Sequence, residues 1–247
     1  MRIILSPAKK MNVNRDDLEP LNIPVFIKQT EEILLWLRNQ PHDELQKIWK
    51  CNDKIATQNF ERISNMDLYS GLTPAILSYD GIAYKYMATA VFENSQFDYV
   101  EEHLRILSAF YGVLKPMDGV TPYRLEMQAK VAIGGYKDLY DLWGKRIYDA
   151  VRDDSGIIIN LASKEYSKCL EKYLSKDDIY ITVNFCEKSG DRLVTKGTYA
   201  KMARGEMVRF MAELSIENPE DIKNFNRLGY VFRDDISTES EYYFEKM

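Results

Sequence analysis

Apolar residues recur along the chain with two periods, and these periods predict both strands and helices. Short apolar runs bounded by turn residues predict strands at 2–5, 75–79, 104–110, 156–161, 179–187, 192–195, 230–233 and 242–245. Apolar positions three and four residues apart predict amphipathic helices at 25–39, 43–50, 53–66, 82–92, 97–102, 139–151, 164–174 and 198–214. We therefore expect an α+β fold, with a mixed sheet and surrounding helices in a single compact unit over residues 1–247.

The predicted helices 43–50 and 53–66 form a tight helical hairpin, because only Cys51 and Asn52 separate them. Hairpins of this kind can present backbone amides to a DNA phosphate, usually with glycines that let the backbone approach closely. Glycine is absent from residues 43–66. Plain helix packing is therefore the alternative to DNA binding.

The segment 104–127 combines a buried strand with a long loop and indicates a site. Tyr111 and Gly112 end the apolar run, and Pro116, Gly119 and Pro122 disfavour regular structure after it. Long loops in packed proteins are commonly functional. The alternative is a structural loop whose Arg and Asp pair with each other. The charged and aromatic residues of this segment are Arg105, Lys115, Asp118, Tyr123, Arg124 and Glu126.

Two further segments lie where ligands bind in open α/β sheets, at the carboxyl ends of predicted strands. Ser6 to Lys9 follows the first strand, and Ser163 follows the strand 156–161 and begins a helix whose first amides attract anions. Lys201 and Arg204 share a helix face and have no acidic partner at helical spacing, although Glu206 could still pair with them. The alternatives are a solvated lysine pair and an ordinary capped helix.

Charge and composition narrow the class of protein. The formal net charge of -5 argues against a protein that coats itself in nucleic acid, but the basic residues gather near the turn-rich segments. We expect these segments to converge into a basic cleft on an acidic body. No apolar run spans a bilayer and the N-terminal apolar stretch is too short for a signal peptide, so we expect a cytoplasmic protein.

The sequence lacks the common signatures of cofactor and metal chemistry. It has no phosphate-cradling or dinucleotide glycine motif, and its three cysteines and two histidines lack metal-ligand spacing. We expect neither a cofactor nor a metal. The remaining polar residues suit binding of a phosphate-bearing partner. They also suit metal-free hydrolysis of a nucleoside, with Asp118 or Glu126 as base and Tyr123 and Arg124 holding the substrate.

Ordered blocks along nearly the whole chain carry a resemblance to a known family. The matching blocks include Ser6-Pro7-Ala8-Lys9, Asp53-Lys54-Ile55-Ala56, Tyr111-Gly112-Val113-Leu114, Pro122-Tyr123-Arg124-Leu125-Glu126-Met127, Asn160-Leu161-Ala162-Ser163 and Ala200-Lys201. Through them the chain resembles the YaaA family of peroxide stress proteins. In two places it departs from the family pattern: Asn52 stands where serine is usual, and Gly81-Ile82-Ala83-Tyr84 where Gly-Asp-Val-Tyr is usual.

The resemblance implies a mixed α and β fold with a positively charged cleft that binds double-stranded DNA, including damaged or structured duplexes. It also implies a helix-hairpin-helix-like element, which falls on residues 43–66, and a role in limiting DNA damage and free iron under hydrogen peroxide. We expect the iron effect to be indirect, because no cluster of metal ligands is visible. The DNA-binding residues implied are Lys9, Lys54, Arg105, Lys115, Arg124, Ser163, Lys201, Arg204 and Arg209.

Two functions thus follow from the sequence. The first is a DNA-binding protein of the oxidative stress response. The second is a metal-independent enzyme that acts on a nucleobase or nucleotide in the same cleft and so takes a nucleotide-like small ligand. Neither function needs a membrane.

Overall fold

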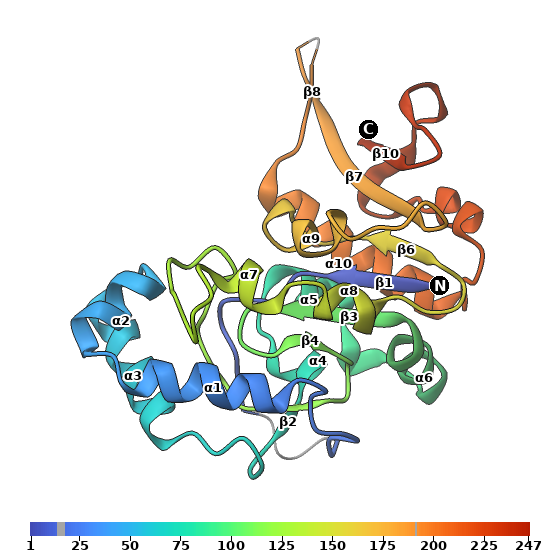
Figure 1. Ribbon diagram of the computed structural model, residues 1–247. Coiled ribbons are helices and arrows are strands. Elements are labelled where there is room, and N and C mark those ends of the chain that lie inside the picture. Colours follow the sequence, from blue (N-terminus) through green and yellow to red (C-terminus); the bar gives the residue numbers. More distant parts are fainter. Residues whose placement is uncertain (14–17, 191) are drawn as a thin grey trace.

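A single large sheet organises the fold (Figure 1), which we describe from a computed structural model of residues 1–13, 18–190 and 192–247. Among these residues eight strands form the sheet, in the order β4-β3-β1-β6-β7-β10-β9, and β8 pairs with β7. The strands are β1 (Arg2–Leu5), β3 (Leu104–Ser108), β4 (Gly112–Leu114), β6 (Ile157–Asn160), β7 (Ile179–Ser189), β8 (Arg192–Val194), β9 (Tyr230–Phe232) and β10 (Glu241–Lys246).

The middle of the sheet is parallel and its edges are antiparallel. Neighbouring strands from β3 to β10 run parallel, whereas β4, β8 and β9 each pair antiparallel with a neighbour. The central strand β1 is apolar at Ile3, Ile4 and Leu5, which are all fully buried, because helices cover both faces of a parallel sheet. The predicted mixed sheet with surrounding helices in one compact unit is confirmed.

The sheet contains a point where the direction of strand addition reverses. The chain passes from β1 to β3 on one side, and then from β3 to β6 on the other side of β1. The chain therefore leaves β1 and β6 toward opposite sides of the sheet, and the loops after them border a crevice at the shared carboxyl edge. Open α/β sheets bind ligands at such a crevice.

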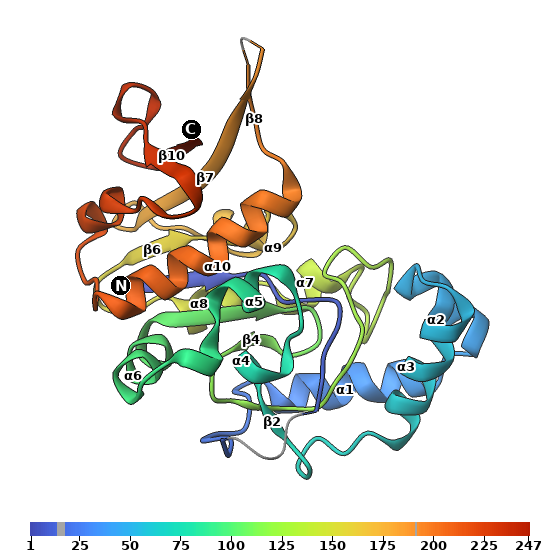
Figure 2. The ribbon, with the colours of Figure 1, turned by 180° about the vertical axis from the view of Figure 1, so that it is seen from behind.

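Helices lie on both faces of the sheet. Figure 1 shows α7, α8 and α9 on the near face, and Figure 2 shows α5, α6 and α10 on the opposite one. The helices are α1 (Ile27–Arg38), α2 (His42–Trp49), α3 (Asp53–Asn65), α4 (Ala75–Ser78), α5 (Ile82–Met87), α6 (Asn94–His103), α7 (Leu139–Trp143), α8 (Arg146–Val151), α9 (Lys164–Glu171) and α10 (Gly197–Glu213). Short 3-10 turns are η1 (Thr89–Val91), η2 (Pro219–Asn224), η3 (Arg227–Gly229) and η4 (Asp234–Ile236).

Two glycines allow α5 to pack closely against its neighbours. A Cβ atom at Gly205 in α10 would lie only 1.9 Å from the carbonyl oxygen of Ala83 in α5. A Cβ atom at Gly81, just before α5, would lie 2.6 Å from the Cβ of Ala8 in the loop after β1. The two contacts fix α10, α5 and this loop relative to one another.

The helical hairpin predicted over 43–66 is present as α2 and α3, and it protrudes from the body on the side toward which β1 runs (Figures 1 and 2). Lys50 adopts a left-handed conformation with φ 45 between the helices. Asn52 caps α3, because its Oδ1 atom accepts a hydrogen bond of 3.0 Å from the amide of Ile55. That this hairpin binds DNA stays a prediction.

Several predicted elements were wrong in type or length. The strand predicted over 75–79 is wrong: Ala75–Ser78 form the helix α4, because the carbonyls of Pro116 and Asp118 accept from the first amides of the helix. The helix predicted over 139–151 is broken at Gly144, where φ is +51. The helix predicted over 82–92 ends at Met87, because Ala88 is left-handed.

The loop after β3 is more regular than its prolines suggested. β4 turns back along β3, and β5 (Gly119–Val120) pairs with β2 (Thr73–Pro74) in a second, two-stranded sheet. The predicted hairpin of β7 and β8 is confirmed, although Asp191 in its turn lies outside the described residues. The predicted pairing of 230–233 with 242–245 is confirmed as β9 and β10.

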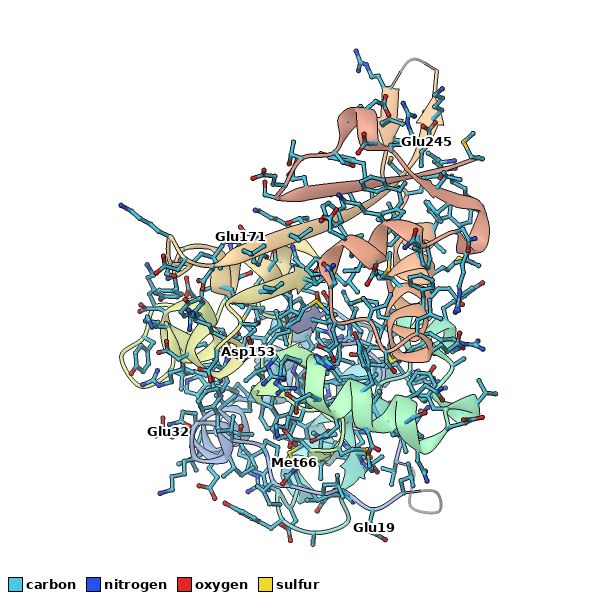
Figure 3. All side chains as sticks on the ribbon, turned by 90° about the vertical axis from the view of Figure 1, so that its right-hand side faces the viewer. Glu19, Glu32, Met66, Asp153, Glu171 and Glu245 are labelled. Atoms are coloured by element: carbon cyan, nitrogen blue, oxygen red, sulfur yellow. The ribbon has the colours of Figure 1, made fainter. Side chains whose placement is uncertain are left out.

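Figure 3 shows Glu19 and Glu245 at opposite ends of the molecule.

Within the described ranges, no helix is long and apolar enough to cross a membrane.

Candidate functional site

A cavity of about 380 Å³ lies at the carboxyl edge of β1 and β6, where the direction of strand addition reverses. It is bounded by the loops after these two strands, the start of α5, the loop 123–126, the first turn of α9 and the N-terminal half of α10. Its polar lining residues are Ser6, Lys9, Lys10, Asp80, Tyr84, Tyr123, Arg124, Glu126, Ser163, Glu165, Tyr166, Lys201 and Arg204.

The loops after β1 and β6 are joined through two serines. The amide of Ser163 donates a hydrogen bond of 2.8 Å to Ser6 Oγ, and the two hydroxyl oxygens lie 3.2 Å apart. Ser163 occupies the N-cap position of α9, as predicted, but its side chain makes no capping hydrogen bond. The first turn of α9 therefore keeps its amides free of a side-chain cap at the cavity.

Two cations reach the cavity from α10. Lys201 is exposed and Arg204 is half-buried, and Arg204 Nε is buried without a hydrogen-bond partner in the described part of the chain. Glu206, the acid that could have paired with them, binds Arg227 at 3.0 Å instead. Within the described residues Lys201 and Arg204 thus form no ion pair with an acidic side chain, as their helical spacing predicted.

One carboxylate and two further cations, which come from the loop after β1 and the loop 123–126, also line the cavity. Lys9 Nζ lies 2.8 Å from Glu126 Oε1, and Arg124 Nη2 lies 3.9 Å from the same oxygen. Arg124 Nε also donates a hydrogen bond of 3.2 Å to the carbonyl of Trp49, the last residue of α2. Arg124 thus connects the cavity to the helical hairpin.

Tyrosines form much of the apolar wall. The hydroxyl of Tyr84 donates a hydrogen bond of 3.0 Å to the Ser6 carbonyl. The hydroxyl of Tyr123 lies 2.7 Å from Ser108 Oγ and 2.9 Å from the Tyr79 hydroxyl. Burial raises the pKa of Tyr123 to about 12. These phenols stay neutral at pH 7 and are engaged internally, so the cavity meets mainly their rings.

Four of the predicted phosphate-binding residues lie outside this cavity. Arg105 is buried in β3, where Nη1 donates to the carbonyls of Glu101 and Leu104. Lys54 is exposed on α3 and Lys115 is exposed after β4. Arg209 Nε lies 2.6 Å from Glu213 Oε1. The structure brings together Lys9, Arg124, Ser163, Lys201 and Arg204 of the predicted set.

The candidate catalytic residues separate in the same way. Tyr123 and Glu126 line the cavity, whereas Asp118 is buried beside β5 and does not. The carboxylate of Asp118 accepts a hydrogen bond of 2.8 Å from the Lys115 amide, and burial raises its pKa to about 7. Asp118 thus acts in the loop scaffold.

Sequence reasoning missed two residues of the site. Asp80 lines the cavity and forms ion pairs with Lys10 and with Lys85, the latter at 3.3 Å. Tyr166 lines it from the first turn of α9. Their positions carried a signal: Asp80 directly precedes the turn glycine Gly81, and Tyr166 follows Ser163 by three residues.

Among the described residues, no three side chains of His, Cys, Asp or Glu are grouped so that they could hold a metal ion.

Comparison with known proteins gives a match over almost the whole chain. The sequence profile of the family described as "Peroxide stress protein YaaA" matches residues 1–236. A protein of Agathobacter rectalis, named "UPF0246 protein", is 68% identical over 246 residues, covering 100% of this chain and 99% of the relative. A protein of the same name from Lachnoclostridium phytofermentans is 52% identical over 246 residues, covering 100% of this chain and 96% of the relative.

Proposed function

This chain belongs to the YaaA family of peroxide stress proteins, and from that premise we propose that it acts in the hydrogen peroxide stress response by binding duplex DNA. Family membership points to a role in oxidative stress. In our proposal the cationic side chains at the cavity hold DNA phosphates and so limit DNA damage. Any effect on free iron is indirect in this proposal.

The convergence of four cations supports the proposal. Lys9, Arg124, Lys201 and Arg204 come from distant parts of a chain with formal net charge -5, yet they line one cavity. With Lys10, the cations in the lining outnumber its carboxylates, Asp80, Glu126 and Glu165. A local excess of cations draws polyanions to a cleft even when the whole protein is acidic.

The helical hairpin extends the same surface. Arg124 contacts both Glu126 in the cavity and the carbonyl of Trp49 at the end of α2. Lys54 is exposed at the start of α3. A duplex that passes the mouth of the cavity therefore also passes the hairpin, and its phosphates can contact both.

A gel-shift series with a 20-base-pair duplex at increasing salt tests the proposal. The double variant Lys9→Gln with Lys201→Gln should lower the slope of log affinity against log salt by about 2, because each lost phosphate contact retains its counterions. Lys223→Gln is the matched control, since Lys223 pairs with Glu220 away from the cavity. Absence of duplex binding by the unaltered protein at low salt would refute the proposal.

A second function is supported by the carboxylate in the cavity. Glu126 has the position needed for a general base, beside rings that could hold a nucleobase. In this alternative the protein is a metal-independent enzyme acting on a nucleobase or nucleotide. Incubation with nucleosides, nucleotides and damaged duplexes, followed by mass spectrometry, tests it. Turnover by the unaltered protein that is lost in Glu126→Gln would support this alternative. Substrates that remain unchanged with the unaltered protein would exclude turnover on that panel.

A further inference from the structure

Arg204 is a half-buried cation with a fully buried Nε atom, and the described part of the chain supplies no anion to it. Its Nε atom makes no hydrogen bond there, and burial lowers the pKa of its guanidinium without an opposing charge. On the same helix Arg209 pairs with Glu213 at 2.6 Å. An unpaired cation is unfavourable in a buried position. We therefore look for its partner outside the chain, in the cavity that Arg204 lines.

The serine side of the cavity offers donors to the same partner. Ser163 places its hydroxyl beside Ser6 Oγ rather than over its own helix, so the first turn of α9 has no side-chain cap. Free amides at a helix N-terminus favour an anion through both hydrogen bonds and the helix dipole. Lys201 adds an exposed ammonium. These groups together suit a compact oxyanion with several acceptor oxygens.

The size of the cavity decides what can carry that oxyanion. A volume of about 380 Å³ is that of a small-molecule site. A duplex cannot enter, since its major groove alone is about 12 Å wide. The close packing of Gly205 against Ala83 and of Gly81 against Ala8 leaves no opening for a ligand on the side of the cavity formed by α5. A phosphate inside a strand needs room for chain on both sides, whereas a terminal phosphate needs only one opening.

The other walls suit a nucleoside. Tyr84 and Tyr123 present rings, because their hydroxyls are engaged by Ser6, Ser108 and Tyr79. Aromatic rings stack on any base. The carboxylate of Glu126 can accept a hydrogen bond from an amino group on a base edge.

We propose, building on the phosphate binding proposed above, that the cavity binds one unpaired nucleotide through its terminal phosphate monoester. Arg204, Lys201, Ser163 and the first turn of α9 hold the phosphate, and the tyrosine rings and Glu126 hold the nucleoside. The same chemistry is present in a free nucleoside monophosphate and in the phosphorylated end of a broken DNA strand. No bond is made or broken in this step.

Fluorescence anisotropy and calorimetry on the full chain test the proposal. The probes are a DNA hairpin with a single-stranded 5′ overhang, bearing either a 5′-phosphate or a 5′-hydroxyl, and deoxyadenosine 5′-monophosphate beside deoxyadenosine. We expect about tenfold tighter binding of at least one phosphorylated probe than of its unphosphorylated form, as for hydrogen bonds to a charged group. Arg204→Gln should abolish this preference, and Lys223→Gln should keep it. Ser163→Ala provides a second variant should Arg204→Gln fail to fold.

The outcomes separate this proposal from the proposed function. A preference confined to the hairpins identifies a strand end as the ligand, and a preference confined to the mononucleotide, without duplex binding, supports the nucleotide site and refutes DNA binding. Equal affinities within both pairs, with salt-sensitive duplex binding retained, overturn the terminal-phosphate site and leave DNA binding standing. A preference that survives in Arg204→Gln and Ser163→Ala also overturns the site.

Discussion

The cavity at β1 and β6 and the outer part of the sheet at β7, β10 and β9 use the same charged residue types in opposite ways. In the outer part cations meet carboxylates: Arg233 pairs with Asp235 at 2.7 Å and with Glu245, and Lys223 pairs with Glu220 at 2.7 Å. In the cavity Lys201 and Arg204 have no such partner among the described residues. In the outer part of the sheet these charged side chains pair with one another, whereas in the cavity Lys201 and Arg204 stay available for a ligand, beside the paired Lys9, Lys10 and Arg124.

The helix α10 contains both arrangements. Its N-terminal half carries Lys201 and Arg204 into the cavity, whereas further along Glu206 and Glu213 share Arg227 from η3. One helix therefore connects a binding wall to a paired scaffold. The difference lies in what faces each cation across space, and not in the helix sequence itself.

The largest effect is expected where α10 meets α5. Gly205→Ala should lower the free energy of unfolding by about 3 kcal/mol, because the added methyl group collides with a backbone oxygen and the helices must separate. Gly197→Ala is the matched control at the start of the same helix, where a Cβ meets no atom within 4 Å. That control should be neutral or slightly stabilising. Urea unfolding measures both, and similar midpoints for the two variants would show that the helices are not in tight contact.

The second largest effect is expected for the pH dependence of stability, which depends on Asp118 outside the cavity. Burial raises the pKa of Asp118 to about 7 in the folded protein, above the value of an exposed carboxyl. The folded state therefore binds the proton more tightly, and stability contributed by the protonated carboxyl is lost as pH rises toward and through 7. Relative to Asp118→Asn, the unaltered protein should lose about 2 kcal/mol between pH 5 and pH 8. Urea midpoints at the two pH values measure the difference, and a pH-independent difference contradicts it.

The third prediction compares an ion-paired arginine, Arg227, with an unpaired one, Arg204. Arg227→Gln should cost about 1 kcal/mol of stability, because it leaves Glu206 and Glu213 without their shared cation, and it should leave DNA binding unchanged. Arg204→Gln should leave stability unchanged or raise it, because it removes a cation whose Nε is buried without a partner among the described residues, and it should weaken binding of the hairpin with a 5′-phosphorylated overhang. Thermal unfolding and gel shift on both variants give the comparison. A loss of stability in Arg204→Gln as large as in Arg227→Gln would mean that Arg204 also serves the scaffold.

The smallest effect is expected at the mouth of the cavity. Lys9→Gln breaks an ion pair whose lysine is largely exposed, so stability should change by less than about 0.5 kcal/mol. The salt slope of duplex binding should fall by about 1, in proportion to one phosphate contact. Lys9→Arg should restore that slope. If Lys9→Gln lowered the free energy of unfolding but left the salt slope unchanged, Lys9 would stabilise the fold and would not bind phosphate.

The sequence predicted most of the sheet, because its central strands are apolar runs with clear boundaries, such as Ile3 to Leu5 and Ile157 to Ile159. It failed at 75–79, where carbonyls from a distant loop hold the first amides of a helix. It also failed at Gly144, where one glycine with a positive φ ends a helix that periodicity alone continues. Contacts across the fold and single backbone conformations leave no periodic trace.

The site was predictable in part for similar reasons. Ser163, Lys201 and Arg204 were chosen by local rules of helix caps and helix faces, and all three line the cavity, although the side chain of Ser163 makes no capping hydrogen bond. Arg105 and Arg209 were chosen by charge and resemblance, but one is buried in β3 and the other is paired with Glu213. Whether a cation has a partner depends on residues far along the chain, which spacing does not reveal.

The position of β1 between two late strands has a consequence for synthesis. Ile4 lies opposite Arg105 on one side and Asn160 on the other, so the first strand leaves the ribosome long before either neighbour exists. Its apolar side chains stay exposed to solvent until β3 and β6 have been synthesised, and contacts between residues so distant along a chain form slowly. We expect nascent chains that stop before Asn160 to need chaperone protection and to lack the cavity.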